Sequence, residues 1–182
     1  KYAVLPMKTV ILCCASLEKE VRLAMARKEI SYPLHILTDN NHDVPNRLRE
    51  AIQRELDGIR DADRVLMAFG TCGGAMVGLR TGNFQLILPR VDDCLSLLMG
   101  SMEQRYAALQ GGFGIFLTES WLRSSRRMEN ELERIRRVYP PKRAETIIRL
   151  MYRNFDSLNV IDTGAYPVES ILPRTQALAE QL

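Results

Sequence analysis

Short apolar runs alternate along the chain with segments in which apolar residues recur every three or four positions. The apolar runs lie at residues 9–15, 32–37, 63–70 and 84–89. Their length and composition predict strands, with the third and fourth buried on both faces. The segments between them predict amphipathic helices, as Leu48, Ile52 and Leu56 illustrate. The alternation predicts an α/β protein with a mainly parallel sheet flanked by helices, in a Rossmann-like three-layer arrangement.

Polar residues, proline and glycine indicate where the predicted helices begin. Ser16 is the expected N-cap of a helix over residues 16–28, and Pro45 opens a second helix in its first turn. Asp92 caps or opens a helix over residues 93–109. The segment Gly70-Thr-Cys-Gly-Gly74 predicts a tight turn that leads from the third strand into a short helix.

The second half of the chain is richer in charge. The remaining predicted elements are strands at 111–118 and 158–163 and helices at 123–137, 145–155 and 168–182. Arginine and glutamate alternate along the first of these helices, which is typical of a solvated face. We expect one α/β domain over residues 1–182, in which residues 119–155 form a charged helical insertion or subregion.

Composition narrows the class of protein. The net charge of +3 gives no support for nucleic-acid binding, and no apolar run approaches the roughly 18 residues of a membrane span. The first residues lack the sustained apolar stretch of a secretory signal. Four cysteines in 182 residues are too few for a disulfide scaffold. We therefore expect a cytoplasmic protein that binds neither nucleic acid nor membrane.

Three cysteines share one kind of position, because each lies near the end of a predicted strand, where the chain turns into a helix. They are Cys14, Cys72 and Cys94. Since the carboxyl ends of parallel strands form the ligand-binding edge of an open sheet, these thiols are expected to meet there. Neighbouring side chains of a strand point to opposite faces, so Cys13 is assigned to the core.

Three thiolates and one further ligand suit a tetrahedral zinc site. His42, in the loop after the second strand, is the best fourth ligand, and Asp92 or Asp93 are alternatives to it. An iron–sulfur cluster is the other cofactor that such thiolates suit, although the short C-x-x-C spacing is absent. Glu20 is expected to orient a ligand.

A second interpretation needs no metal. Helix N-termini lower the pKa of a cysteine, so Cys72 is a candidate nucleophile with Cys14 or Cys94 as the resolving thiol. The candidate catalytic residues are Cys72, Asp93 and Glu20. Three glycines and one arginine are candidates for binding a cofactor or an anion, namely Gly70, Gly73, Gly74 and Arg90.

Several motifs are similar to those of one known family. The segments CASLEKE, HDVPNRLREAIQ, FGTCGGAMVGL, LPRVDDCLSLLMGS and GGFGIFLTESWL resemble, in this order, the hallmark stretches of a prokaryotic family catalogued as a domain of unknown function. The motif positions are Cys14, Glu20, His42, Pro45, Gly70, Cys72, Gly73, Pro89, Arg90, Asp93, Cys94 and Trp121. Asp92 stands where the family often has histidine, and Phe69 replaces tyrosine.

Genes of that family often lie beside corrinoid-dependent methyltransferases. The resemblance therefore implies a metal-binding protein of one-carbon or corrinoid methyl metabolism, with a small thiol or methylated compound as substrate. It also implies a third interpretation, an accessory protein that delivers a cofactor or metal to a methyltransferase. The charged helix at 123–137 is the expected partner surface in that case.

Overall fold

The computed structural model describes residues 7–38, 44–109, 112–124 and 126–182. The chain divides into two compact units, 1–105 and 106–182, and each unit has a parallel sheet. No helix within the described ranges is both long and apolar enough to cross a membrane. The positions expected for the site lie in the first unit, apart from Trp121.

The first unit contains the larger sheet, sheet A. Its strands are β1 (Thr9–Cys14), β2 (Leu34–Leu37), β3 (Arg64–Ala68) and β4 (Gln85–Ile87). The helical elements of this part of the chain are the 3₁₀ turn η1 (Ala15–Leu17), α1 (Glu18–Arg27), α2 (Pro45–Gly58), α3 (Cys94–Leu98) and α4 (Met102–Ala108). Strand and helix thus alternate as the sequence predicts.

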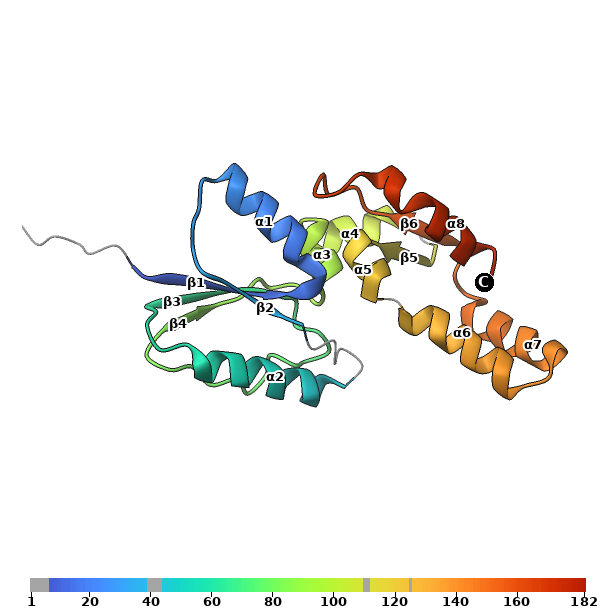
Figure 1. Ribbon diagram of the computed structural model, residues 1–182, viewed down its shortest axis with the longest axis horizontal. Helices are drawn as coiled ribbons and strands as arrows, with labels where there is room; N and C mark the ends of the chain where they lie inside the picture. The colour runs from blue at the N-terminus through green and yellow to red at the C-terminus, as the bar shows by residue number, and fades with distance from the viewer. Residues whose placement is uncertain (1–6, 39–43, 110–111, 125) are drawn as a thin grey trace, which may run out of the picture. The chain divides into compact units, whose positions relative to one another are not determined.

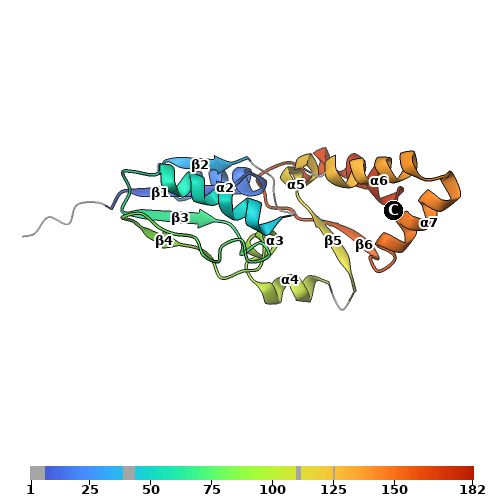
Figure 2. The same ribbon diagram turned by 90° about the horizontal axis from the view of Figure 1, so that it is seen from below.

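All neighbouring strands of sheet A are parallel, in the order β2-β1-β3-β4 (Figure 2). The chain leaves β1 toward β2 on one side and returns to place β3 on the other side of β1. The strand order therefore reverses between β1 and β3. Open α/β sheets bind ligands outside the carboxyl ends of the strands at such a reversal.

Side chains of β1 alternate between two apolar layers. Leu12 and Cys14 pack on the face covered by α2, whereas Ile11 and Cys13 pack on the face covered by α1 and α3 (Figure 1). From α2, Leu48 and Ile52 are fully buried against the first layer. Burying each of these large aliphatic side chains stabilises the fold by roughly 1.5–3 kcal/mol. Helices on both faces of a parallel sheet confirm the predicted three-layer α/β fold.

The second unit has a two-stranded parallel sheet of its own (Figure 1). Its elements are β5 (Gly114–Leu117), α5 (Glu119–Ser124), α6 (Arg126–Val138), α7 (Pro141–Tyr152), β6 (Ser157–Val160), the 3₁₀ turn η2 (Val168–Ser170) and α8 (Leu172–Ala179). Its core gathers Leu117, Leu132, Ile148 and Leu178 from four of these elements. Trp121 packs against this core.

Two of the predicted helices begin or end at other residues than expected. Ser16 lies within η1, and the N-cap of α1 is Leu17, without a side-chain hydrogen bond. The helix expected at 93–109 is interrupted, because Gly100 adopts a φ of 88° after α3. Pro45 occupies the first turn of α2, as predicted.

Two further predictions, on the burial of the fourth strand and on the segment after the third strand, were wrong. The fourth strand was expected to be buried, but β4 lies at the edge of sheet A and its end residues are exposed. The glycine turn at Gly70–Gly74 was expected to lead into a short helix. Residues 72–78 instead form successive turns, because Cys72, Gly73 and Gly74 all have positive φ and so leave the right-handed helical region.

Gly70 determines how closely the segment after β3 approaches the segment before α3. A Cβ atom at Gly70 would lie 2.3 Å from Asp93 Cα and 2.6 Å from Asp93 N. No side chain fits in that space, and the atoms in the way belong to the backbone. The two segments can pass each other at this distance only because residue 70 is glycine.

We expect Gly70→Ala to lower the free energy of unfolding by about 1–3 kcal/mol, because the added methyl group must displace the backbone at Asp93. Gly58→Ala is the matched control, since nothing lies within 4 Å of a Cβ placed there. Urea denaturation followed by circular dichroism measures both changes. Equal stability of the two variants would contradict the proposed close approach.

Candidate functional site

The three strand-end cysteines lie at the carboxyl edge of sheet A. Cys14 is the last residue of β1, Cys72 lies in the turn after β3, and Cys94 is the first residue of α3. Cys14 and Cys72 therefore follow the two neighbouring strands between which the strand order reverses. The position matches the place where open α/β sheets bind ligands.

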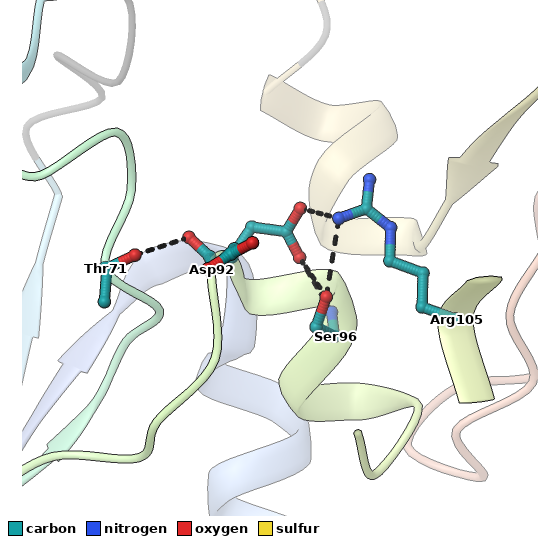
Figure 3. Close-up of polar contacts among 5 residues, drawn as sticks. Thr71, Asp92, Ser96 and Arg105 are labelled. Atoms are coloured by element: carbon teal, nitrogen blue, oxygen red, sulfur yellow. Dashed lines mark hydrogen bonds and ion pairs between the residues drawn. The ribbon is translucent and has the colours of Figure 1, made fainter. Parts of the chain in front are cut away.

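Backbone hydrogen bonds hold the Cys72 turn beside the segment that leads to Cys94. Thr71 N donates to Val91 O at 2.9 Å, and Cys72 N donates to Asp92 O at 2.8 Å. The Thr71 hydroxyl adds a bond to the same Asp92 carbonyl at 3.2 Å (Figure 3). These bonds position Cys72 while its φ is 46°, an uncommon value for a residue other than glycine.

The three thiols form a chain of hydrogen bonds with Cys94 in the middle. Cys94 bonds to Cys14 on one side and to Cys72 on the other. Cys14 is 1% exposed and also bonds to the Ser16 hydroxyl, with 3.0 Å between Sγ and Oγ. Cys72 and Cys94 are half-buried. The tertiary structure thus brings together three thiols that are far apart in the sequence.

These hydrogen bonds separate the acidities of the thiols. The bond from Cys94 holds the pKa of Cys72 below its ordinary value of 9.0, and a backbone bond from Gly70 acts in the same direction. For Cys94, the bond with Cys14 lowers the pKa, but the bond to Cys72, burial and the charge of Cys72 outweigh it and raise the pKa to about 11. Of the two thiols, Cys72 is therefore the more acidic, and Cys94 is the one that keeps its proton and donates a hydrogen bond to Cys72.

Cys13 is separate from this chain, as predicted. It is fully buried on the other face of β1, and its thiol donates to the Cys14 carbonyl at 3.1 Å. Burial raises its pKa, because a thiolate loses its hydration there. The nearby charges of Glu18 and Glu20 act in the same direction. We infer that Cys13 is an inert core residue.

Asp93 and Arg105 stabilise the start of α3, where Cys94 lies. Asp93 is the N-cap, and its Oδ1 accepts from Ser96 N and from the Ser96 hydroxyl, both at 2.8 Å. Its other oxygen forms an ion pair with Nη1 of Arg105, which also contacts the Ser96 hydroxyl (Figure 3). Arg90, the arginine that the sequence suggested for binding a cofactor or an anion, is exposed.

The other residues predicted for the site lie in different surroundings. Glu20 is on α1, where its charge acts on Cys13. His42 lies outside the described residues. Gly73 and Gly74 follow Cys72, and the Gly74 carbonyl accepts a 3.5 Å hydrogen bond from Arg49 of α2. A Cβ at Gly73 would lie 3.3 Å from Pro45, so the turn also packs on the start of α2.

Cys14, Cys72 and Cys94 offer sulfur ligands to a metal ion. Within the described ranges, no group of three or more histidine, cysteine, aspartate or glutamate side chains is arranged to hold a metal. The chemistry of the donors nevertheless fits, because three linked cysteine sulfurs are the ligands that zinc accepts in structural and catalytic sites. A metal ion bound by these cysteines would displace the thiol protons.

Sequence reasoning missed two residues, Ser96 and Arg105, which hold the start of α3 in place through Asp93. Arg105 lies in a helix with no motif around it, and Ser96 reads as an ordinary polar residue of α3. The signal available for Ser96 was its place three residues after Asp93, which is the spacing of an N-cap hydrogen bond. No local pattern connects Arg105 to Asp93.

We expect substitutions of the Asp93–Arg105 pair to move the Cys72 pKa in opposite directions. The charge of Asp93 raises that pKa. Asp93→Asn should therefore lower it further while preserving an N-cap, and Arg105→Gln should raise it by leaving the Asp93 charge unpaired. The pH dependence of Cys72 alkylation by iodoacetamide, measured on the isolated peptide by mass spectrometry, reports this pKa.

Arg90→Gln is the control for removing an arginine charge, because Arg90 is exposed. It should leave the alkylation profile unchanged. If both Asp93→Asn and Arg105→Gln left the profile unchanged, or moved it in the same direction, the pair would have no electrostatic role at Cys72.

Comparison with known proteins identifies the family. No curated protein and no solved structure matches the chain. The family model described as "Protein of unknown function (DUF1638)" matches residues 36–182. This range includes Cys72 and Cys94, begins after Cys14, and continues beyond Trp121 to include the whole second unit. Because the model covers well over half of the sequence, the chain belongs to the DUF1638 family of proteins of unknown function.

Proposed function

We propose that this protein binds zinc at the carboxyl edge of sheet A and acts in one-carbon or corrinoid methyl metabolism. The observation that carries the proposal is the placement of Cys14, Cys72 and Cys94 at the carboxyl edge of sheet A, beside the reversal of strand order. Cys14, Cys72 and Cys94 would hold the ion. His42, which lies outside the described residues, is the proposed fourth ligand or an alternate to one of the three.

Soft thiolate ligands favour zinc over hard cations such as magnesium and calcium. A zinc ion bound by thiolates supplies Lewis-acid chemistry and activates a thiol substrate for methyl transfer. An iron–sulfur cluster is the other group that such thiolates hold. Metal analysis distinguishes the two, because only the cluster contributes iron and acid-labile sulfide.

The chain's own residues prepare this site in three ways. Gly70 allows the Cys72 turn to pass close to Asp93. Asp93 and Arg105 fix the first turn of α3 and hence the position of Cys94. Burial of Cys14 in the core on the α2 side keeps the third thiol in place. Each thiol therefore has its own structural support, which reduces the cost of gathering them around one ion.

The role in methyl metabolism is supported by the resemblance to a family whose genes often lie beside corrinoid-dependent methyltransferases. The substrate class that suits a zinc–thiolate site is a small thiol or a methylated compound. Delivery of a cofactor or metal to the methyltransferase is the accessory form of the same proposal, with the charged segment at 123–137 as the partner surface.

A metal-free thiol enzyme is the second candidate. It is favoured by the surroundings of Cys72, which is half-buried rather than sealed, lies in a turn with a φ of 46°, and accepts hydrogen bonds from Cys94 and the Gly70 backbone. These features are typical of a nucleophilic cysteine. In this case Cys72 attacks an electrophilic substrate carbon, and Cys94 supplies a proton to the leaving group.

We expect protein purified without oxygen to contain about one equivalent of zinc, because thiolate sites bind this ion tightly. Cys14→Ser, Cys72→Ser and Cys94→Ser should each weaken zinc binding by more than about tenfold, since each removes a ligand. Affinity should fall as the pH is lowered, because protons compete with zinc for the thiols. Elemental analysis and competition with a chromogenic chelator measure these quantities.

Cys13→Ala is the matched control, because it removes a buried thiol on the opposite face of the same strand. It should retain zinc. Less than about a tenth of an equivalent of any transition metal in the unsubstituted protein would overturn the zinc proposal. In that event, rapid and selective alkylation of Cys72 would favour the thiol enzyme, and uniformly slow labelling of all cysteines would oppose it.

A further inference from the structure

We propose that Cys72 and Cys94 form an oxidation site for hydroperoxides, at which the two thiols close into a disulfide. The inference goes beyond metal binding, because it concerns the metal-free thiols and names a different class of reactant. It is carried by the fixed juxtaposition of two half-buried thiols on neighbouring segments, with the remaining cysteines sealed in the core.

Backbone contacts hold the two cysteines near each other before any reaction. Gly70 leaves no room for a side chain against Asp93, and Cys72 N bonds to Asp92 O at 2.8 Å. Cys94 follows directly after these residues as the first residue of α3. Both cysteines also pack against the same core cluster beneath α2. A disulfide requires the sulfurs to approach to about 2.05 Å, which side-chain rotation supplies most easily when the backbones are already adjacent.

Exposure distinguishes Cys72 and Cys94, which an oxidant from solution can reach, from the two buried cysteines of β1. Cys13 is 0% and Cys14 is 1% exposed, whereas Cys72 and Cys94 are half-buried. Cys14 also bonds to Ser16 and packs among the residues of the core beneath α2. A hydroperoxide therefore reaches Cys72 and Cys94 more readily than the two cysteines of β1.

The chemistry balances with one hydroperoxide molecule as the oxidant. The Cys72 sulfur attacks the terminal peroxide oxygen, the O–O bond breaks, and the products are a sulfenic acid at Cys72 and one molecule of water or alcohol. The Cys94 sulfur then attacks the Cys72 sulfur and displaces the hydroxyl group. That group leaves as water with the proton of Cys94. Two thiols are oxidised to one disulfide, and the peroxide is reduced by two electrons.

Oxidation at this pair has a consequence for the proposed zinc site, and this part of the inference rests on the proposed function. A disulfide removes two of the three sulfur ligands, so the oxidised protein should not retain zinc. Bound zinc should in turn slow oxidation, because it occupies the same sulfurs. Peroxide and zinc then compete for one site.

The test uses metal-free, reduced protein treated with one equivalent of hydrogen peroxide, then alkylated and digested. We expect a peptide pair joined through Cys72 and Cys94, and a whole-protein mass lower by two hydrogen atoms. Cys13 and Cys14 should be recovered alkylated after denaturation. Prior loading with zinc should slow disulfide formation at least severalfold.

Cys13→Ala should form the same disulfide, whereas Cys72→Ser and Cys94→Ser should not. The unsubstituted protein provides the decisive measurement, because it does not depend on how well the variants fold. A disulfide through Cys14, or oxidation of Cys72 to sulfinic acid without a disulfide, would overturn the inference. If the Cys72–Cys94 disulfide forms but no zinc binds, the oxidation site stands and the zinc proposal fails. If zinc binds but no disulfide forms, the reverse holds.

Discussion

The close passage of Gly70 beside the backbone of Asp93 determines the geometry of the candidate site. It allows Thr71 and Cys72 to bond to the carbonyls of Val91 and Asp92, and these bonds connect the end of β3 to the start of α3. Without that approach, Cys72 and Cys94 would belong to separate loops. The positions of Cys72 and Cys94 relative to each other therefore depend on Gly70, which has no side chain. A methyl group at residue 70 would push the backbone at Asp93 away and so change the spacing of these two cysteines.

Different interactions hold each of the three cysteines in place. Cys14 is held by the core beneath α2, which is a non-directional contribution from apolar burial. Cys94 is held by a directional network in which Asp93 caps α3 and Arg105 neutralises Asp93. Cys72 is held mainly by backbone bonds, in a turn with positive φ that packs against the core beneath α2.

The proposed zinc binding and the proposed thiol oxidation would use the same sulfurs for the same physical reason. The fold gathers these thiols, each able to carry a proton, at the carboxyl edge of sheet A, and it couples their pKa values. A metal ion replaces those protons and keeps the sulfurs reduced, whereas an oxidant removes protons and electrons and joins two sulfurs directly. The difference in burial between Cys14 and the other two thiols makes the outcome selective, since the core cysteine is available to an inward-facing ligand set but not to a reagent from solution.

Local periodicity was sufficient to predict the parallel α/β fold, the opposite faces of Cys13 and Cys14, and the start of α2 at Pro45, because strand alternation and proline geometry are properties of adjacent residues. It also indicated that Cys14, Cys72 and Cys94 share one sheet edge. Only the tertiary structure decided that Asp93 rather than Asp92 caps α3, that Arg105 pairs with Asp93, and that the glycine turn is followed by further turns instead of a short helix. Those outcomes depend on contacts between segments that are distant in the chain, and on positive φ values that the surrounding structure imposes, so no local pattern contains them.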